Sequence, residues 1–305
     1  MNTSHSIGTD QILPLPALDD IADDFLPQGL PPVVDAHVHI FPDRIFSAVR
    51  EWFDENGWPI RYRMAAHDTL AFLLERGVAH VVALQYAHRP GVAGMLNPFM
   101  TRICERFDRV TGLATVFPGE PDAAGILETA FEQGLSGVKL HAHVQCFSID
   151  GPDMATIYDV CQANDMPLVM HVGREPKSDA YRCDPYELCR VDLVEAVLRR
   201  YPRLKLCVPH LGADEFTAYH RLLSEYDNLW LDTTMVLADY LPIGTELPPL
   251  ADFRSDRVMF GTDFPNIPYA WDREIKKLAA MGIDASFLAR LLGENAAAFY
   301  GISQF

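Results

Sequence analysis

The feature that most constrains the fold is a repeated alternation of short apolar strands with longer helices. Eight segments have the length and apolar content of buried strands, and helical segments separate most of them. The predicted strands are 33–40, 78–86, 110–117, 137–141, 167–172, 204–209, 228–233 and 257–262. The predicted helices are 67–77, 97–108, 122–133, 153–164, 186–200, 214–226, 270–281 and 285–299. Because adjacent parallel strands need a crossover connection, this pattern predicts repeated βαβ units.

Eight such units predict a closed (β/α)8 TIM barrel. Residues 33–302 provide about 34 residues per unit, which suits eight strands and their helices. The alternative is an open, doubly wound sheet, in which a glycine-rich phosphate loop often follows the first strand. No such loop follows residues 33–40. We therefore expect an α/β protein with a single barrel domain over residues 33–305.

Residues 1–32 form an acidic, proline-rich extension ahead of this barrel. The stretch contains five aspartates and five prolines, and it has too few large apolar side chains to fold alone. It is either disordered or laid across the barrel or a neighbouring subunit. Contacts of the second kind would use its apolar side chains, Ile12, Leu13, Leu15 and Phe25. The sequence leaves these alternatives open.

Charge and cysteine content limit the partners and the compartment. The formal net charge is −17, which argues against nucleic acid or an anionic membrane as a partner. A small anionic substrate is still compatible with this negative charge, because a local arginine or a metal ion can bind an anion. The six cysteines form no CxxC pair and are expected to be reduced thiols. No lysine or arginine precedes Arg44 and no long apolar run occurs, so we expect a cytoplasmic protein without a signal peptide or membrane span.

The first predicted strand, 33–40, carries candidate metal ligands. At a period of two, four apolar residues are expected on one face: Val34, Ala36, Val38 and Ile40. Asp35, His37 and His39 are expected on the other face. Two imidazoles spaced two residues apart on a strand can reach one cation. This strand therefore predicts a metal site as well as a packing surface.

Further polar residues stand where other predicted strands end. They are Lys139, His141 and His143 around the fourth strand, His171 at the fifth, His210 after the sixth and Asp263 after the eighth. In a barrel the functional site lies at the carboxyl ends of the strands. We therefore expect these side chains to gather at one mouth of the barrel.

These motifs resemble the amidohydrolase superfamily. They are Asp35-Ala-His37-Val-His39, Gly137-Val-Lys139-Leu-His141, His171-Val-Gly, His210-Leu-Gly and Gly261-Thr-Asp263-Phe-Pro, in that order. The sequence is most similar to the branch of TIM-barrel metal-dependent hydrolases that includes aminocarboxymuconate-semialdehyde decarboxylase and related lactone hydrolases. The resemblance covers about residues 33–302 and includes the closing segment 292–301.

The resemblance implies that His37, His39, His171 and Asp263 bind a divalent cation, most often zinc. Neutral imidazoles and one carboxylate are suitable zinc ligands, and a catalytic zinc site keeps a position for water. The resemblance also implies that Asp263 accepts the water's proton and that His210 orients the water or polarises the substrate. The sequence also allows another divalent metal in place of zinc.

Two further roles are open for Lys139. In binuclear members of the superfamily a carboxylated strand-four lysine bridges two metals, so a second zinc shared by His171 and His210 is one of them. The close branch implies one zinc per chain, which we expect here. A Schiff-base lysine is the other alternative, and it would need a depressed pKa and no metal.

Substrate contacts are expected from residues near the predicted mouth. His141 and His143 continue from the fourth strand, and Arg174 follows His171 and suits a carboxylate because guanidinium binds carboxylate through two hydrogen bonds. Candidates of lower rank are Tyr181, Arg182, Thr233 and Thr234.

The resulting hypothesis is a zinc-dependent hydrolase that acts on the carbonyl of an ester, lactone or amide in a small, carboxylated substrate. The alternative is a non-oxidative, metal-dependent decarboxylase that uses the same residues. A non-catalytic binding barrel would need a closed coordination shell. No nucleic-acid or membrane partner is expected, and a homodimer is possible.

Overall fold

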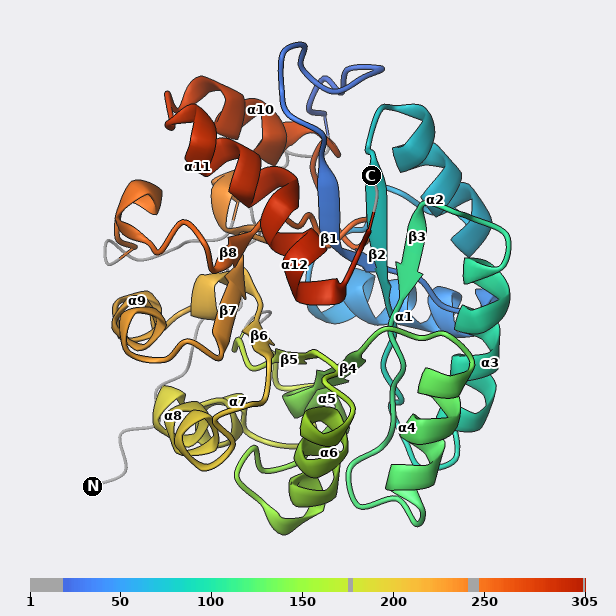
Figure 1. The fold of residues 1–305 in the computed structure, drawn as a ribbon. Coiled ribbons are helices and arrows are strands. Elements are labelled where there is room, and N and C mark those ends of the chain that lie inside the picture. The colour runs from blue at the N-terminus through green and yellow to red at the C-terminus, as the bar shows by residue number, and fades with distance from the viewer. Residues whose placement is uncertain (1–18, 175–177, 241–246, 304) are drawn as a thin grey trace, which may run out of the picture.

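The computed structural model describes residues 19–174, 178–240, 247–303 and 305. Its strands gather at the centre and its helices surround them (Figure 1). The strands are β1 Val34–His39, β2 His80–Leu84, β3 Val110–Gly112, β4 Val138–His141, β5 Leu168–His171, β6 Leu206–Val208, β7 Leu229–Asp232 and β8 Val258–Met259. The helices are α1 Asp43–Asn56, α2 Ala66–Glu75, α3 Ala93–Cys104, α4 Ala123–Glu132, α5 Ala142–Gln145, α6 Pro152–Ala163, α7 Pro185–Leu188, α8 Val191–Arg200, α9 Phe216–Glu225, α10 Arg273–Ala280, α11 Ala285–Ala289 and α12 Asn295–Tyr300. Within these described residues, no helix is both long and apolar enough to span a membrane.

The eight strands close into a parallel barrel, which confirms the predicted fold. Neighbouring strands pair in chain order within two groups, β1 to β3 and β4 to β8. Backbone bonds join the groups at both seams: Ala114 N donates to Gly137 O at 2.9 Å, and Ala36 N donates to Phe260 O at 3.0 Å. Parallel bridges between Ala114 and Val138, and between Val38 and Phe264, continue these seams.

A bulge in β1 changes the face on which its side chains lie. The pairing with β2 runs Val34 to His80, but it has shifted by one residue where Val38 meets Ala83. Val34 and Ala36 pack inside the barrel, whereas Val38 packs in the outer layer between strands and helices. The prediction of one continuous apolar face was therefore wrong, because the extra residue reverses the alternation.

The closing helix α12 covers the end of the barrel opposite the carboxyl ends of the strands. Ala296, Phe299 and Tyr300 pack against residues inside the barrel, including Val34 and Trp230. Tyr300 Oη also donates to Ala36 O at 3.4 Å. In Figure 1 this helix lies across the strands near β1 and β8. The other end of the barrel, formed by the carboxyl ends of the strands, is therefore left for a functional site.

Helix α5 was not predicted, and the helices differ from the prediction in three further places. Helix α1 was not expected, although Ile45, Val49 and Trp52 recur at helical spacing. Helix α3 begins four residues before the predicted 97. Pro98 is tolerated inside it because Gly94, whose carbonyl loses its partner, is exposed to solvent.

The predicted helix 186–200 is two helices, α7 and α8. Asp184 caps α7 by accepting from Tyr186 N at 2.8 Å. Val191 N then donates to Glu215 Oε2 at 3.0 Å. This carboxylate satisfies a backbone donor at the start of α8, so the chain begins a second helix there.

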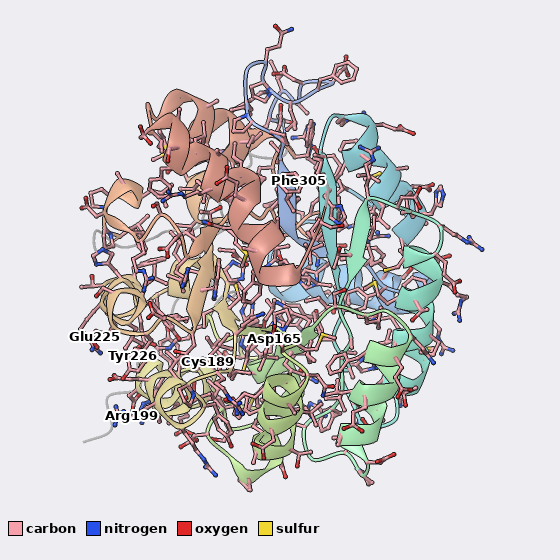
Figure 2. The ribbon with its side chains drawn as sticks, in the orientation of Figure 1. Asp165, Cys189, Arg199, Glu225, Tyr226 and Phe305 are labelled. Carbon is pink, nitrogen blue, oxygen red and sulfur yellow. The ribbon has the colours of Figure 1, made fainter. Side chains whose placement is uncertain are left out.

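Surface charges tie neighbouring helices together. Glu195 on α8 accepts from Arg199 on its own helix at 3.3 Å and from Arg221 on α9 at 3.1 Å. Tyr226 Oη, just after α9, also donates to Glu195, at 3.2 Å. Figure 2 shows Arg199 and Tyr226 close together on this side of the molecule.

The described part of the N-terminal extension lies against the barrel. Asp20 pairs with Arg273 at 2.7 Å, and Asp23 pairs with Lys276 at 2.9 Å. Leu26 N donates to Arg76 O at 3.0 Å. Residues 19–32 therefore follow the alternative in which this segment lies on the barrel. Ile12, Leu13 and Leu15 lie outside the described residues.

Replacement of Gly212 tests the packing beside the sixth strand end. Its φ of +79° disfavours any other residue, and an added Cβ would lie 2.0 Å from Tyr219 Cδ2. We expect Gly212→Ala to lower the free energy of unfolding by more than about 2 kcal/mol, measured by urea denaturation. Gly282→Ala is the matched control, because Gly282 has a φ of +65° but open space around it. The control should cost about 1 kcal/mol, and equal losses in both variants would contradict the clash.

Candidate metal centre

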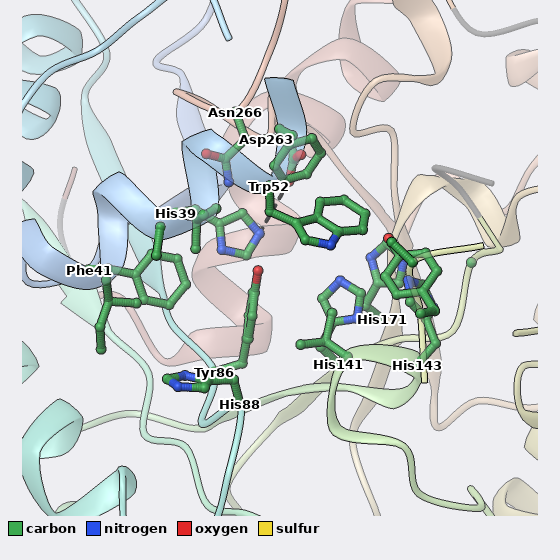
Figure 3. Close-up of a pocket in the computed structure, with 18 of the residues that line it drawn as sticks. His39, Phe41, Trp52, Tyr86, His88, His141, His143, His171, Asp263 and Asn266 are labelled. Atoms are coloured by element: carbon green, nitrogen blue, oxygen red, sulfur yellow. Dashed lines mark ion pairs between the residues drawn. The ribbon is translucent and has the colours of Figure 1, made fainter. Parts of the chain in front are cut away.

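The polar residues predicted at the strand ends gather around one cavity. The cavity has a volume of about 1020 Å³, and its lining includes His39, His141, His143, His171, His210 and Asp263. Figure 3 shows His39 and Asp263 on one side and His141, His143 and His171 on the other, with the Tyr86 hydroxyl pointing between them. The carboxyl ends of five strands therefore contribute to one site.

His37, His39 and Asp263 form the first group of candidate ligands. One atom from each lies within 4.8 Å of the others. The Nε2 atoms of His37 and His39 are 3.2 Å apart, and Asp263 Oδ1 lies 3.4 Å and 3.2 Å from them. All three side chains are buried. This separation lets three donor atoms converge on one cation.

Asp232 at the end of β7 determines which nitrogen of His37 faces this group. His37 Nδ1 donates to Asp232 Oδ2 at 2.9 Å. Burial lowers the pKa of His37 to about 3, with Lys139 contributing, so the ring is neutral at pH 7. Burial opposes ionisation of Asp232, but the nearby His37 holds the pKa of this carboxyl below its usual value. His37 Nε2 therefore presents a bare lone pair toward Asp263.

The first group has a donor set that suits a divalent cation. Burial would raise the pKa of Asp263, but His39 and the neighbouring histidines lower it. The ionised Asp263 and the lone pair of His37 are both acceptors, yet they face one another at 3.4 Å. Lys139 and His39 offset part of this repulsion, and two imidazoles with a carboxylate suit zinc.

Lys139 lies inside the barrel beside the first group. Its Nζ is 3.3 Å from His37 Nε2. Burial lowers the pKa of Lys139 to about 8, although Asp232 and Asp263 oppose the shift. The lysine can therefore supply positive charge to this cluster. A carbamate on Lys139 stays the alternative to the single zinc expected from the sequence.

His171, the fourth predicted ligand, lies at the end of β5. It forms a second group with His141 and His143, again with one ligand atom each within 4.8 Å. Burial lowers the pKa of all three rings, to about 4 for His143. His210 stands between the groups, with ring centroids 5.7 Å from His37 and 4.8 Å from His171.

Two of the predicted catalytic residues have an unusual backbone. His210 has a φ of 58° and Asp263 a φ of 65°, in the left-handed region that side chains other than glycine rarely adopt. Such strain persists where the surrounding structure holds it, and it clusters at active sites. His210 is held by its backbone N, which donates to Asp232 Oδ1 at 3.0 Å. Asp263 N donates to His37 O at 2.9 Å.

The candidate substrate residues are distributed differently from the prediction. Arg174 does not line the cavity. Its guanidinium pairs instead with Asp214 at 3.2 Å and Glu215 at 2.7 Å, so the structure gives no support to its predicted substrate contact. Arg182 and Tyr181, ranked lower, do line the cavity. Thr233 and Thr234 are buried beside Asp232.

Several lining residues were not anticipated. Trp52 and Phe53 come from the unexpected helix α1, and Tyr86, His88 and Arg89 come from the connection after β2. Asp232 was also missed, although it is a polar residue ending the apolar strand β7. The reasoning that selected Asp263 applies equally to Asp232, and it could have identified this residue.

A parallel (β/α)8 barrel whose strand ends bring histidines and an aspartate to one mouth has the architecture of a TIM-barrel enzyme. This chain belongs to the amidohydrolase family, whose profile matches residues 34–302. The family resemblance seen in the sequence is thereby confirmed, and the protein is an enzyme of the hydrolase or carboxy-lyase kind. No curated protein sequence matches the chain.

Solved structures share its fold at low sequence identity. The 5-carboxyvanillate decarboxylase of Sphingomonas paucimobilis is 18% identical, with a TM-score of 0.64 over 89% of this chain and 99% of that one. A Pseudomonas putida protein provisionally named a 2-pyrone-4,6-dicarboxylic acid hydrolase is 17% identical, with a TM-score of 0.61 over 90% and 99%. The 5-carboxyvanillate decarboxylase of Novosphingobium aromaticivorans, complexed with manganese and 4-hydroxy-3-methoxy-5-nitrobenzoic acid, is 17% identical, with a TM-score of 0.62 over 92% and 99%. The fold is therefore used by both decarboxylases and hydrolases.

Replacement of Asp232 tests how the first group is oriented. In Asp232→Asn the carboxylate that accepts from His37 Nδ1 becomes an amide, which can donate to that nitrogen and move the ring proton to Nε2. We expect zinc affinity to fall about 10- to 100-fold, measured by competition with a chromogenic chelator. Asp252→Asn, at an exposed position, is the control. Unchanged affinity in Asp232→Asn would contradict the proposed orientation.

Proposed function

We propose that the protein is a metal-dependent hydrolase acting on the carbonyl group of a small, carboxylated ester, lactone or amide. The observation that carries the proposal is the convergence of His37, His39 and Asp263 at the cavity. Three protein ligands leave a coordination position open, as catalytic zinc sites require. A bound zinc ion would supply Lewis acidity to the carbonyl and lower the pKa of water. Manganese is the alternative ion, since two similar structures hold it.

The chain's own residues provide the proton transfers. The ionised Asp263 stands at the cavity and can accept a proton from the attacking water and return it to the leaving group. His210 lines the same cavity and is oriented by Thr234, whose carbonyl accepts from His210 Nδ1 at 2.9 Å. His210 Nε2 lies 3.1 Å from His171 Nδ1, so the ring would have to exchange this contact to orient water or substrate.

The cavity wall favours a flat, anionic substrate. Its aromatic lining residues are Phe41, Trp52, Phe53, Trp58, Tyr86, Tyr181 and Phe216. Three exposed arginines also line it: Arg44, Arg89 and Arg182. Aromatic faces stack on planar groups, and guanidinium groups bind carboxylates. These arginines can attract a carboxylated ring to the cavity although the protein as a whole is acidic.

A decarboxylase is the second candidate, because the same aromatic wall suits a carboxylated aromatic acid. Two of the similar structures are 5-carboxyvanillate decarboxylases. The two reactions give different products: a hydrolase consumes water and forms a new acid, whereas a decarboxylase releases carbon dioxide. Screening carboxylated lactones and carboxylated phenols, with both products measured, separates the candidates.

Removal of a ligand tests the metal mechanism. We expect His37→Ala and Asp263→Ala to lower kcat at least 10²-fold, to about the background rate, because each removes a ligand or the proton acceptor. Chelation of the wild-type enzyme should stop turnover, and added zinc should restore it. His67→Ala, on the exposed surface of α2, is the control. Full activity in a folded Asp263→Ala variant would disprove the mechanism.

Arginine variants test the anion contact. We expect Arg182→Gln to raise KM about tenfold for a carboxylated substrate, because one charge-assisted bond contributes about 1.5 kcal/mol or more. Arg174→Gln should leave KM nearly unchanged, since its guanidinium is paired with Asp214 and Glu215. The reverse pattern in steady-state kinetics would restore Arg174 as the substrate residue.

A further inference from the structure

Helix α1 presents an apolar face to the cavity. Its residues Ile45, Val49 and Trp52 recur at helical spacing, and all three line the cavity. Within α1, which is described over its whole length, only Phe46 is fully buried. The three lining side chains are half-buried. They therefore keep apolar surface that no described residue covers.

This face continues into a wider apolar patch that begins beside a candidate metal ligand. Ile45 and Val49 pack against a buried cluster that contains Phe41. The Phe41 ring lies nearly parallel to the His39 ring, with centroids 6.1 Å apart. Figure 3 shows Phe41 beyond His39, on the side away from His171. The patch therefore extends from the candidate metal centre toward α1.

Residues from four segments of the chain make up this patch, which we call the apolar compartment. They are Phe41, Ile45, Val49, Val92, Met95 and Val144. All six line the cavity, and none of them carries a charge. Met95, in the first turn of α3, is 48% exposed and extends the compartment toward solvent. A continuous apolar wall of this kind is typical of a ligand-binding surface.

The cavity is larger than one carboxylated ring requires. Its volume of about 1020 Å³ lies at the upper end of the range of about 300–1,000 Å³ that is usual for drug-sized ligands. A single ring at the candidate metal centre would leave the apolar compartment to water. An apolar group that displaces this water is more favourable, because it removes apolar surface from solvent.

We propose that the apolar compartment binds an uncharged aryl arm of the substrate, so that the substrate is an extended carboxylate with two rings. This inference deepens the proposed function and rests on it for the position of the reacting group. The arm extends from the candidate metal centre past Phe41 and along α1. The rings of Phe41 and Trp52 favour an aryl arm over an alkyl arm, because aromatic pairs gain from offset-stacked or edge-on contact.

Calorimetry on the full, zinc-loaded chain tests the proposal with two probes, benzoate and biphenyl-4-carboxylate. Each acid carries one carboxylate, so the difference between their Kd values reports the contribution of the second ring. We expect biphenyl-4-carboxylate to bind the wild type at least about tenfold more tightly than benzoate. Equal Kd values for the two acids would overturn the proposal.

A variant that fills the compartment shows where the second ring binds. We expect Val49→Trp to raise the Kd of biphenyl-4-carboxylate at least about tenfold and to change that of benzoate less than about twofold. Ser47→Trp is the matched control, because Ser47 is an exposed residue of the same helix that does not line the cavity. It should leave both Kd values unchanged. Met95→Trp, at an exposed position, is the second variant if Val49→Trp does not fold.

Tighter binding of biphenyl-4-carboxylate that the filling variant leaves unchanged would also overturn the proposal, since the second ring would then bind elsewhere. A second copy of the chain is the other occupant that can cover this face. Sedimentation velocity of the unliganded wild type and of Val49→Trp detects it. A dimer that Val49→Trp dissociates, together with equal Kd values for the two acids, would assign the face to a contact between copies.

Because calorimetry needs no turnover, this inference and the proposed function can fail separately. Second-ring selectivity that Val49→Trp abolishes, without hydrolysis or decarboxylation of any carboxylated substrate, would support the apolar compartment and reject the proposed function. Hydrolysis of single-ring lactones without second-ring selectivity would reject the compartment and leave the proposed function standing.

Discussion

The closure of the barrel between β1 and the segment after β8 is the interaction on which the site depends. Asp263 N donates to His37 O at 2.9 Å, and His39 N donates to Phe264 O at 2.8 Å. These bonds place a carboxylate from one end of the chain beside two imidazoles from the other. The bulge in β1 directs both imidazoles toward the mouth. Without the closure, the acceptors of the first group would not face each other.

A buried polar network then orients the histidines. Asp232 accepts from the ring of His37 and from the backbone of His210, and Thr234 orients the His210 ring. Because all of these groups are buried, each unpaired atom carries a large desolvation cost. The network therefore specifies which nitrogens present lone pairs to the cavity. The hydrolase proposal rests on this orientation.

Much of the fold was predictable because the strands are marked by local sequence. Each predicted strand contains one of the eight observed strands, and the polar residues that follow them do lie at one mouth. Helix α1 and the break between α7 and α8 were missed. The spacing of Ile45, Val49 and Trp52 could have identified α1, whereas the start of α8 depends on a contact distant in sequence, because Glu215 provides its cap. Arg174 looked available from its position, but its neutralising partners come from the segment after the sixth strand.

By itself the sequence determined the class of fold and the chemical types at the strand ends, since periodicity and side-chain identity are local properties. The tertiary structure decided how those side chains are grouped. His171 lies close to His141 and His143, and the ring of His210 stands between it and His37. Grouping depends on ring orientation, and ring orientation depends on hydrogen bonds to Asp232, Thr234 and Gly173. Such partners are brought together only by folding, because they are far apart along the chain.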